Sequence, residues 1–482
     1  MSFEILDNIK DTIQAVIQSV TTPPPPPPAQ TAEQIEARVN ASTSDPAQRD
    51  LLTQGYTQAQ QQGDGALWQQ TEDLATLYHD REVLALSRSI APGDDVPDGW
   101  TRATPAQLEA YGLSEQDLRP NGPQSDQGFR AELFIPDPAV YGPDALPVLQ
   151  FEGTNFGDLS DVNADVAQAM GNDEAFYNRA IDIATRANAA SGGDIIFSGH
   201  SLGGGLATAA GLATGARTIV SNPAGVHPDT VADALADRGL SFDNADGNIS
   251  TYAVDGDLLT ELQDTTAGLS GQNADSLAAI LNGVGHGLNI YQDDVAFPTN
   301  VTGQQVRDLP DAVGDVTTLE ARNADGSARP EITSLETIVG DINDRVGQMP
   351  VDDFASLVEG GTNIVDEVTG FLGGLANGAG DGLNTLSEHI PDGGLLGGFG
   401  DLISGGGDVV ATMGDYIEQG GDITLDIAEG LETAGSIAVE ATDGEVRDSV
   451  MEMVDRHSFG VFDGAMESTI NDQEQALQEQ LD

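Results

Sequence analysis

Hydrophobic and polar residues follow two different periods along the chain. Between about residues 128 and 270, short apolar runs with the character of strands alternate with stretches whose apolar residues recur every three or four positions. The strand-like runs are GFRAELFI, LPVLQFEGT, DIIFSGHS, ARTIVSNPAGV and NISTYAV. Because strands that alternate with helices pair into a mainly parallel sheet, this part of the chain predicts an α/β domain.

The segments on either side of this domain have helical patterns. Residues 1–20 predict an amphipathic helix for docking or oligomerisation, and the prolines of TTPPPPPPAQ predict a stiff spacer after it. The spacing of Phe459, Phe462, Met466 and Ile470 predicts another amphipathic helix near the end of the sequence. The expected division is an amphipathic helix and polyproline linker at 1–30, a helical N-terminal region at 31–127, the α/β core at 128–300, a Gly-rich insert or lid at 301–450, and a C-terminal helix returning to the core at 451–482.

The Gly-rich stretch from about residue 330 to 450 allows three interpretations. Leu, Ile and Val stand between its many glycines, which favours helices that pack closely or meet a membrane. The run GGFGDLISGGGDVV is similar to a calcium-binding β-roll repeat, but Asp401 and Asp408 are out of register for that repeat. A flexible linker is the third interpretation. We expect a helical insert or lid.

Acidic residues far outnumber basic ones. The 482 residues include 79 Asp and Glu against 18 Lys and Arg, a formal net charge of −61, and Lys10 is the one lysine. This charge excludes nucleic acid as an expected partner, since a polyanion would be repelled. Because the acids are scattered through patterned segments rather than gathered in blocks, we favour adaptation to high salt over an acidic, partly disordered chain.

Cysteine is absent, so neither a disulfide framework nor thiolate chemistry is expected. Residues 1–20 do not have the pattern of a signal peptide, because acids interrupt the apolar stretch. No uninterrupted apolar run reaches the roughly 18 residues of a membrane span. The location is therefore open between the cytoplasm and export by a dedicated secretion system.

Residues 195–207, IIFSGHSLGGGLA, pass from an apolar strand through a tight turn into a helix of small residues. Ser201 lies in this turn, within the G-x-S-x-G motif of residues 199–203. A serine at such a turn projects its Oγ atom above the sheet, and the glycines let strand and helix approach each other. The next N–H group, that of Leu202, then points at a developing oxyanion near the helix N-terminus. This context favours a nucleophile over an ordinary turn serine.

The run FSGHSLGGGLA resembles the nucleophile elbow of the class 3 lipase type of α/β-hydrolase, in particular that of bacterial phospholipase-like effector proteins delivered by secretion systems. LQFEGTNFGDLSDVNADVAQAMG, SNPAGV and YAVDGDLLTELQD resemble three further stretches of that family. The resemblance implies an α/β-hydrolase with a mainly parallel central sheet, to which this chain adds an N-terminal helical segment and a Gly-rich, helical insert.

The same resemblance assigns roles to individual residues. It implies that Thr154 supplies the second oxyanion donor beside Leu202. It also implies Asp257 as the catalytic acid, because Asp257 matches the family's Gly-Asp-x-Leu pattern, with Asp255 as the alternative at the end of the same predicted strand. Glu152 departs from the family, which usually has Arg at this position. A carboxylate pointing inward would oppose an oxyanion, so we expect Glu152 to face solvent.

Six histidines compete for the role of general base. His457 begins the predicted C-terminal helix and also resembles the family's terminal H-x-x-x-x-V segment, so we favour it. His286, in the glycine loop NGVGHGLNIY, is the alternative. His200 adjoins the nucleophile and is expected to pack or to face solvent. The choice of His457 makes residues 290–450 an insertion between the acid and the base.

These residues together predict a serine hydrolase that cleaves carboxylic esters of lipids, a lipase or phospholipase, through a Ser201–His457–Asp257 triad and an acyl-enzyme. No cofactor or metal is expected, because the carboxylates and histidines lack ligand spacings. The expected partners are a lipid or ester substrate, a membrane surface in contact with the Gly-rich insert, and a protein partner for residues 1–20. A non-catalytic lipid-binding or interaction protein, a soluble short-chain esterase and a secreted antibacterial effector remain alternatives.

Overall fold

The computed structural model covers the whole chain, and the fold is described for the α/β body and the helices at either end of it. The described residues are 25–120, 128–153, 175–242, 248–257, 259–261, 263, 274, 302–307, 309–323, 325–334, 337, 449, 452, 453 and 455–482. The predictions for residues 1–20 and for nearly all of the Gly-rich stretch lie outside the described residues. Thr154, His286 and His389 lie outside them as well.

Seven strands of the described chain form one sheet, and their order in space is their order in the sequence. They are β1 (Trp100–Arg102), β2 (Ala131–Pro136), β3 (Val148–Phe151), β4 (Ile196–His200), β5 (Arg217–Ser221), β6 (Ile249–Val254) and β7 (Asp315–Leu319). The first three strands pair antiparallel, and the pairs from β3 to β7 are parallel. The predicted fold class, an α/β-hydrolase with a mainly parallel sheet, is confirmed.

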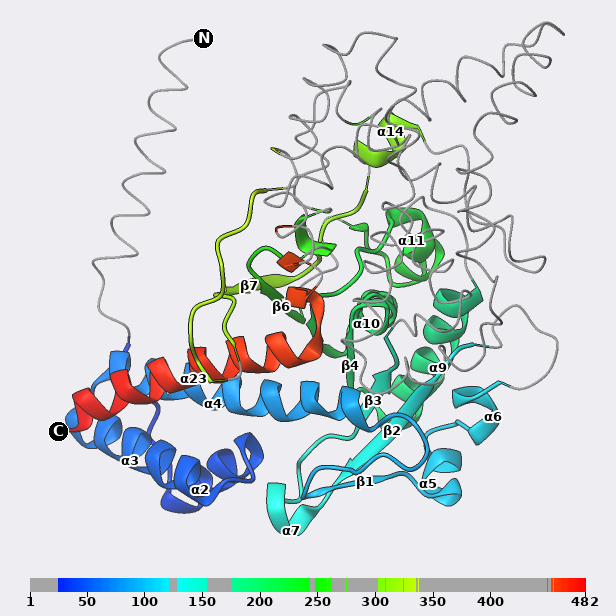
Figure 1. The fold of residues 1–482 in the computed structure, drawn as a ribbon. Coiled ribbons are helices and arrows are strands. Elements are labelled where there is room, and N and C mark those ends of the chain that lie inside the picture. Colours follow the sequence, from blue (N-terminus) through cyan, green and yellow to red (C-terminus); the bar gives the residue numbers. More distant parts are fainter. Residues whose placement is uncertain are drawn as a thin grey trace, which may run out of the picture.

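Helices that alternate with the parallel strands cover one face of the sheet (Figure 1). They are α9 (Ala175–Ser191), α10 (Leu202–Thr214) and α11 (Pro228–Asp237). Their apolar residues form a core cluster with Leu149, Phe197 and Val220 of the sheet. The helix α10 is buried along nearly its whole length, because its Gly and Ala residues let it lie close to the strands.

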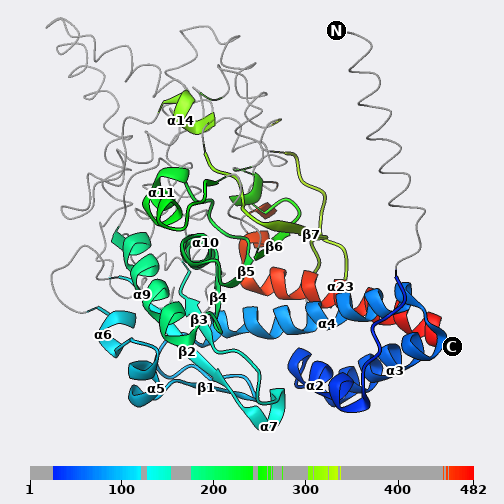
Figure 2. The same cartoon turned by 180° about the vertical axis from the view of Figure 1, so that it is seen from behind.

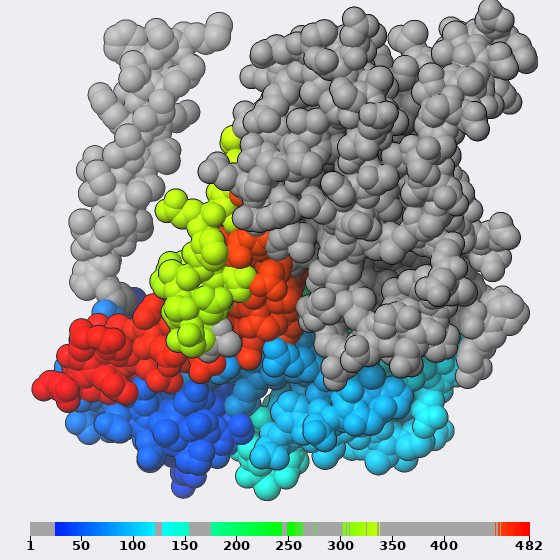
Figure 3. Space-filling model, in the orientation of Figure 1, coloured from blue at the N-terminus to red at the C-terminus, as the bar shows by residue number. Residues whose placement is uncertain are grey.

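Helices from both ends of the chain cover the opposite face (Figure 2). α4 (Gly65–Ala85) from the N-terminal region and α23 (Phe459–Leu481) from the C-terminal region contact the strands, and α2 (Ala32–Ser42) and α3 (Pro46–Gln62) pack against α4. Their apolar residues pack with Val148, Ile196 and Ile219 in a second core cluster. The space-filling view shows α23 lying along the N-terminal helices (Figure 3).

Consecutive residues of the central strands point to opposite faces of the sheet and so pack alternately into the two core clusters. On β4, Ile196 packs under the N-terminal helices and Phe197 packs under α10. On β5, Ile219 and Val220 divide in the same way. Because both faces of the sheet are covered, the central strands are continuous apolar runs rather than alternating ones, which is why the sequence marks them clearly.

Asp80 joins α4 to the sheet through a fully buried carboxylate. Arg217 of β5 donates a hydrogen bond to Oδ1 at 2.7 Å, and Tyr252 of β6 donates to Oδ2 at 2.9 Å. Burial opposes ionisation of Asp80, but His79, Arg217 and Tyr252 outweigh it and lower the pKa of the carboxyl group. Since breaking a buried pair leaves an uncompensated charge, this contact fixes the helical layer over β5 and β6.

The apolar pattern does not predict two of the strands. The strand β1 has three residues, and β7 lies within the range 301–450 that was assigned to the Gly-rich insert. Four of the five residues of β7 are exposed at the edge of the sheet, so this strand lacks the apolar run that marks the central strands. The sheet therefore continues past the expected end of the core at residue 300, as far as Leu319.

Short helical elements complete the described fold. They are η1 (Leu86–Ser89), α5 (Pro105–Ala110), α6 (Glu115–Leu118), α7 (Pro138–Tyr141) and α14 (Gly303–Arg307). None of the helices that the structure describes combines the length and the apolar character needed to cross a membrane.

Candidate active site

Ser201 lies at the turn between β4 and α10 in a backbone conformation that residues with a side chain rarely adopt. Its φ and ψ angles are 58° and −128°. The N–H group of Ser201 donates to the carbonyl of Ser221 at 3.1 Å. The carbonyl of Ser201 accepts from the N–H groups of Gly205 and Ala224, at 3.1 and 3.0 Å. Strain that neighbouring contacts hold in place is typical of a nucleophile elbow.

The glycines around Ser201 leave no space for a side chain. A Cβ atom on Gly199 would lie 2.0 Å from the carbonyl oxygen of Gly203. A Cβ atom on Gly203 would lie 2.3 Å from the carbonyl oxygen of Phe151. The spacing of the G-x-S-x-G motif therefore follows from the close approach of α10 to β3 and β4.

Three side chains that are distant in the sequence meet at the carboxyl ends of the parallel strands. The Nε2 atom of His457 lies 2.8 Å from Oγ of Ser201, and Nδ1 of the same ring lies 2.6 Å from Oδ2 of Asp257. Ser201 follows β4, Asp257 lies beyond the end of β6, and His457 precedes the N-terminus of α23. Asp257 is fully buried, and Ser201 is 6% exposed. A nucleophile, a general base and an orienting carboxylate need this arrangement.

The two candidate acids differ in where their carboxylates lie. Oδ1 of Asp257 accepts hydrogen bonds from the N–H group and the hydroxyl of Thr260, at 2.9 and 3.0 Å. These bonds leave Oδ2 directed at His457. Asp255 is exposed, and its backbone N–H donates to the carbonyl of Leu319 in β7. The structure thus brings Asp257, rather than Asp255, to the imidazole.

Four of the six histidines lie among the described residues. Nδ1 of His79 on α4 lies 2.9 Å from the carboxylate of Asp80, and His227 caps α11. His200 faces the site from the end of β4. Of these four described histidines, His457 is the one whose ring lies within hydrogen-bond distance of Ser201.

A family model described as the Tle-like phospholipase domain matches residues 74–321. The chain belongs to this family. The matched range holds the sheet from β1 to β7, includes Ser201 and Asp257, and ends before His457. The phospholipase-like relationship predicted from the elbow is confirmed, whereas the class 3 lipase assignment stays a prediction.

The chain is also similar to a protein named extracellular phospholipase A1, from Serratia liquefaciens. The two sequences are 31% identical over 241 residues. The alignment covers 50% of this chain and 64% of the relative, so it spans slightly less than two thirds of the relative's length.

The oxyanion side of this phospholipase-like site is described in part. Leu202 is 1% exposed and begins α10, where the first N–H groups have no partner within the helix. Thr154 lies outside the described residues. Glu152 is half-buried rather than facing solvent as expected, and its N–H continues the strand pairing by donating to the carbonyl of Arg130 at 3.0 Å. Burial raises the pKa of Glu152, while Arg130 and Arg119 act in the opposite direction.

His200 packs against His457. The ring centroids of His200 and His457 are 5.2 Å apart, and Phe459 meets His200 edge-on at 5.5 Å. Nδ1 of His200 lies 3.1 Å from the hydroxyl of the buried Ser221. Desolvation lowers the pKa of His200 to about 3, and His457 acts in the same direction. His200 is therefore a neutral side chain whose ring packs against His457 and Phe459.

Two residues near Ser201, Asp257 and His457 were not singled out from the sequence. Oδ1 of Asn222 accepts a hydrogen bond from the N–H of Val254 at 2.9 Å, and Arg456 donates to the carbonyl of Asp255 at 2.7 Å. The place of Asn222 in the SNPAGV stretch, which resembles the family, is the signal that could have identified it. Arg456 stands out only as a scarce cation next to His457.

Metal-binding residues do not gather in the described part of the chain. No cluster of three or more His, Cys, Asp or Glu side chains among the described residues is arranged to hold an ion. The polar groups around Ser201 are instead a hydroxyl, an imidazole and a carboxylate in hydrogen-bond sequence.

Proposed function

We propose that the protein is a serine hydrolase that cleaves carboxylic esters of phospholipids. The observation that carries this proposal is the hydrogen-bond chain from Asp257 through His457 to Ser201 at a strained elbow. Membership of the Tle-like phospholipase family supports the choice of a lipid ester as substrate. Because the Serratia liquefaciens relative is named a phospholipase A1, the sn-1 ester is the first position to test.

The proposed reaction begins when Nε2 of His457 accepts the proton of the Ser201 hydroxyl. The oxygen of Ser201 then attacks the ester carbonyl, and the imidazolium returns its proton to the departing alcohol as the acyl-enzyme forms. A water molecule, deprotonated by the same imidazole, attacks the acyl-enzyme, and the fatty acid leaves as Ser201 is reprotonated. Asp257 keeps the Nδ1–H tautomer of His457 and stabilises the imidazolium in both steps.

The negative charge on the oxygen of the tetrahedral intermediate is stabilised by hydrogen-bond donors that are in place before the reaction begins. The N–H of Leu202 at the start of α10 serves this role in our proposal, and the helix N-terminus adds positive potential there. The resemblance of the stretch LQFEGTNFGDLSDVNADVAQAMG to the phospholipase-like effector family makes Thr154 the second donor. The Gly-rich stretch from about residue 330 to 450 is proposed to contact the membrane surface or the acyl chain.

Hydrolysis of phosphatidylcholine vesicles tests this proposal. The two acyl chains should differ in length, so that mass spectrometry of the released fatty acid and of the lysophospholipid identifies the ester that is cut. A zwitterionic headgroup is suitable because a chain of net charge −61 is repelled by anionic vesicles. We expect a fatty acid and a lysophospholipid from the wild type at molar KCl.

Ser201→Ala and Ser198→Ala form a matched pair for this assay. Ser198 lies on β4, the strand that Ser201 follows. It is fully buried, and its hydroxyl has no hydrogen-bond partner among the residues that the structure describes. We expect Ser201→Ala to abolish release and Ser198→Ala to retain it. Hydrolysis confined to short-chain, water-soluble esters would favour the soluble esterase instead. A folded wild type that cleaves no ester would favour a non-catalytic lipid-binding protein.

A further inference from the structure

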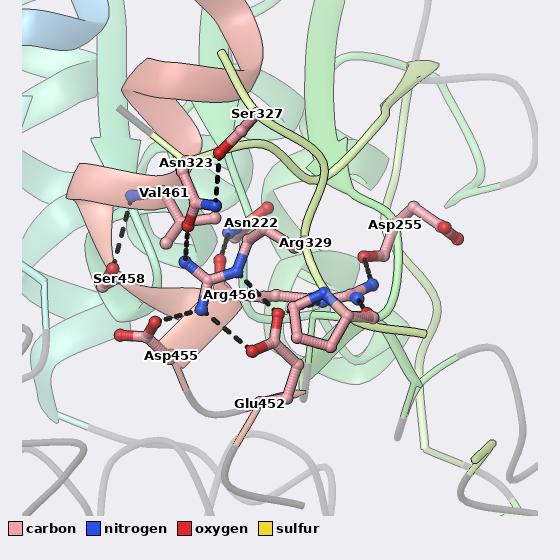
Figure 4. Close-up of polar contacts among 11 residues, drawn as sticks. Asn222, Asp255, Asn323, Ser327, Arg329, Glu452, Asp455, Arg456, Ser458 and Val461 are labelled. Atoms are coloured by element: carbon pink, nitrogen blue, oxygen red, sulfur yellow. Dashed lines mark hydrogen bonds and ion pairs between the residues drawn. The ribbon is translucent and has the colours of Figure 1, made fainter. Parts of the chain in front are cut away.

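Arg456, the residue before His457, is almost completely buried and holds its own segment against the segment of the acid. Its exposed fraction is 4%. Nη1 donates to the carbonyl of Asp255 at 2.7 Å, and Nη2 donates to the carbonyl of Pro330 (Figure 4). Asp255 is two residues from Asp257. One guanidinium therefore connects the backbone that carries the proposed base with the backbone that carries the proposed acid.

The glycine of the Gly-Asp pair makes room for this guanidinium. Gly256 has a φ of 67°, and a Cβ atom there would lie 2.6 Å from Nη1 of Arg456. The same Cβ atom would lie 2.4 Å from Cδ1 of Ile332. Glycine is thus needed at position 256 for two reasons. It adopts the positive φ of the turn before Asp257, and it leaves room for the guanidinium of Arg456.

A second connection joins the same two segments through Asn222. Its Oδ1 accepts from the N–H of Val254 at 2.9 Å, and its Nδ2 donates to the carbonyl of Arg456 at 3.5 Å. Asn222 follows β5 and has a φ of 39°, so its backbone is held in a strained conformation between the elbow and the acid. Arg456 is consequently fixed at its side chain and at its carbonyl.

A carboxylate close to Arg456 in the chain, that of Glu452, orients the guanidinium. Nε of Arg456 donates to Oε1 of Glu452 at 3.0 Å. Arg329 donates to both oxygens of Glu452, at 2.6 and 2.9 Å, and also pairs with Asp455. Burial disfavours the charged form of Glu452, but the hydrogen bonds from Arg329 and Arg456 outweigh it and lower its pKa. The carboxylate is thus held ionised between two arginines, as Figure 4 shows.

We propose that Arg456 is a positioning residue, which sets the distance of His457 from Ser201 and Asp257 by bridging the His457 segment to the carbonyls of Asp255 and Pro330. This inference rests on the proposed function. The planar guanidinium presents several donors in fixed directions, which a lysine ammonium does not. Small displacements of a catalytic group reduce the rate of chemistry strongly, so this bridge acts on kcat rather than on substrate binding.

The test compares full-length wild type, Arg456→Met, Arg456→Lys and Arg81→Met. Arg81 is the matched control, because it ties the same C-terminal segment to α4 through Asp463 and Glu467, at 3.0 Å each, without touching the acid. The steady-state kcat and KM are measured with p-nitrophenyl butyrate at molar KCl. The folded fraction of each variant is measured by circular dichroism at the assay temperature.

We expect Arg456→Met to lower kcat by about tenfold to a hundredfold with KM changed by less than about twofold. Arg456→Lys keeps a charge and a donor, so it should retain the fold and recover part of kcat even if the Met variant folds poorly. Arg81→Met should keep the wild-type kcat of its folded fraction.

Two results overturn the inference while leaving the proposed function intact. In the first, the wild type is active and Arg456→Lys and Arg456→Met both have its kcat. In the second, Arg81→Met loses as much kcat as the Arg456 variants at equal folded fraction, which would make the role one of general attachment. A folded wild type that cleaves neither p-nitrophenyl butyrate nor the phosphatidylcholine vesicles would instead overturn the proposed function, and this inference with it.

Discussion

The Nε2 atom of His457 lies 2.8 Å from the Oγ atom of Ser201, although 256 positions separate the two residues in the chain. The imidazole reaches the elbow from the helical layer, because α23 packs on α3 and α4 across the sheet from α10. The site is therefore complete only when the segment of His457 and the C-terminal helix are docked on this layer.

Asp257 and Asp255 provide a test of the acid. In the proposed triad, the buried carboxylate of Asp257 holds the Nδ1–H tautomer of His457, and an amide at this position would favour the other tautomer. We expect Asp257→Asn to lower kcat by roughly three to four orders of magnitude, as loss of the orienting acid does in other serine hydrolases. Asp255→Asn changes an exposed side chain and should stay within about twofold of wild type. Equal losses in both variants would refute the assignment.

Gly203 provides a test of the elbow. The Cβ atom of Gly203→Ala would lie 2.3 Å from the carbonyl oxygen of Phe151, so α10 must shift away from β3. We expect this variant to lose stability by about 1–3 kcal/mol, as overpacked sites do, and to lose activity through displacement of Ser201. Thermal unfolding and ester hydrolysis measure the two effects.

Gly460 is the matched control for this substitution. It lies in the first turn of α23, and the nearest atom to its Cβ position is 3.9 Å away. Because alanine is the better helix former, Gly460→Ala should be neutral or stabilising by up to about 1 kcal/mol. A destabilisation of Gly460→Ala equal to that of Gly203→Ala would contradict the steric explanation.

The lowered pKa of His200 predicts that the folded state loses stability in acid. Its pKa of about 3 lies below the ordinary value of 6.5, so between these values the unfolded chain binds a proton that the folded chain does not. The contribution of His200 to the free energy of unfolding is therefore fully present above pH 6.5. It is lost as the pH falls from 6.5 toward 3, by up to about 1.4 kcal/mol per pH unit. His200→Phe keeps a ring beside His457 and removes the titration.

Urea unfolding at two pH values measures this contribution. We expect His200→Phe to lose less free energy of unfolding than wild type between about pH 6.5 and about pH 5, by about 2 kcal/mol. The comparison uses the change with pH within each protein, so the lost hydrogen bond to Ser221 cancels. Equal acid sensitivity of both proteins would show that His200 is not held neutral by the fold.

Salt should stabilise the protein. At low ionic strength the many acidic side chains repel one another, because the net charge is −61. Salt screens this repulsion between exposed charges more than it screens buried ion pairs such as that of Arg456 with Glu452. We expect the thermal midpoint and the activity to rise from low to molar KCl. Sucrose, which has no charge, is the control, because it strengthens burial without screening. Equal stability at low and molar KCl would contradict adaptation to high salt.

The central strands and the elbow could be predicted because burial on both faces leaves a continuous apolar run, as in β4 and β5. Ser201 could be predicted because the glycines that its turn requires are visible in the sequence. The edge strand β7 could not, since four of its five residues are exposed and carry no apolar signal.

The connections between distant segments could not be predicted either. Arg456 contacts the carbonyl of Asp255 across 201 positions of the chain, and no pattern in the sequence relates the two residues. His457 was favoured from the pattern of its helix and a family resemblance, yet nothing in its spacing places it opposite Ser201. Such pairings depend on how α23 packs on the N-terminal helices, and this is a property of the folded chain.

The most direct measurement of the central claim is the site and rate of labelling by a fluorophosphonate, which reacts with an activated serine. Wild type, His457→Ala and His286→Ala are labelled at molar KCl, and mass spectrometry locates the adduct. The proposed triad predicts modification of Ser201 in the wild type and in His286→Ala, and a loss of labelling by several orders of magnitude in His457→Ala. Labelling that survives His457→Ala, or a folded wild type that does not react, would contradict an activated Ser201 served by His457.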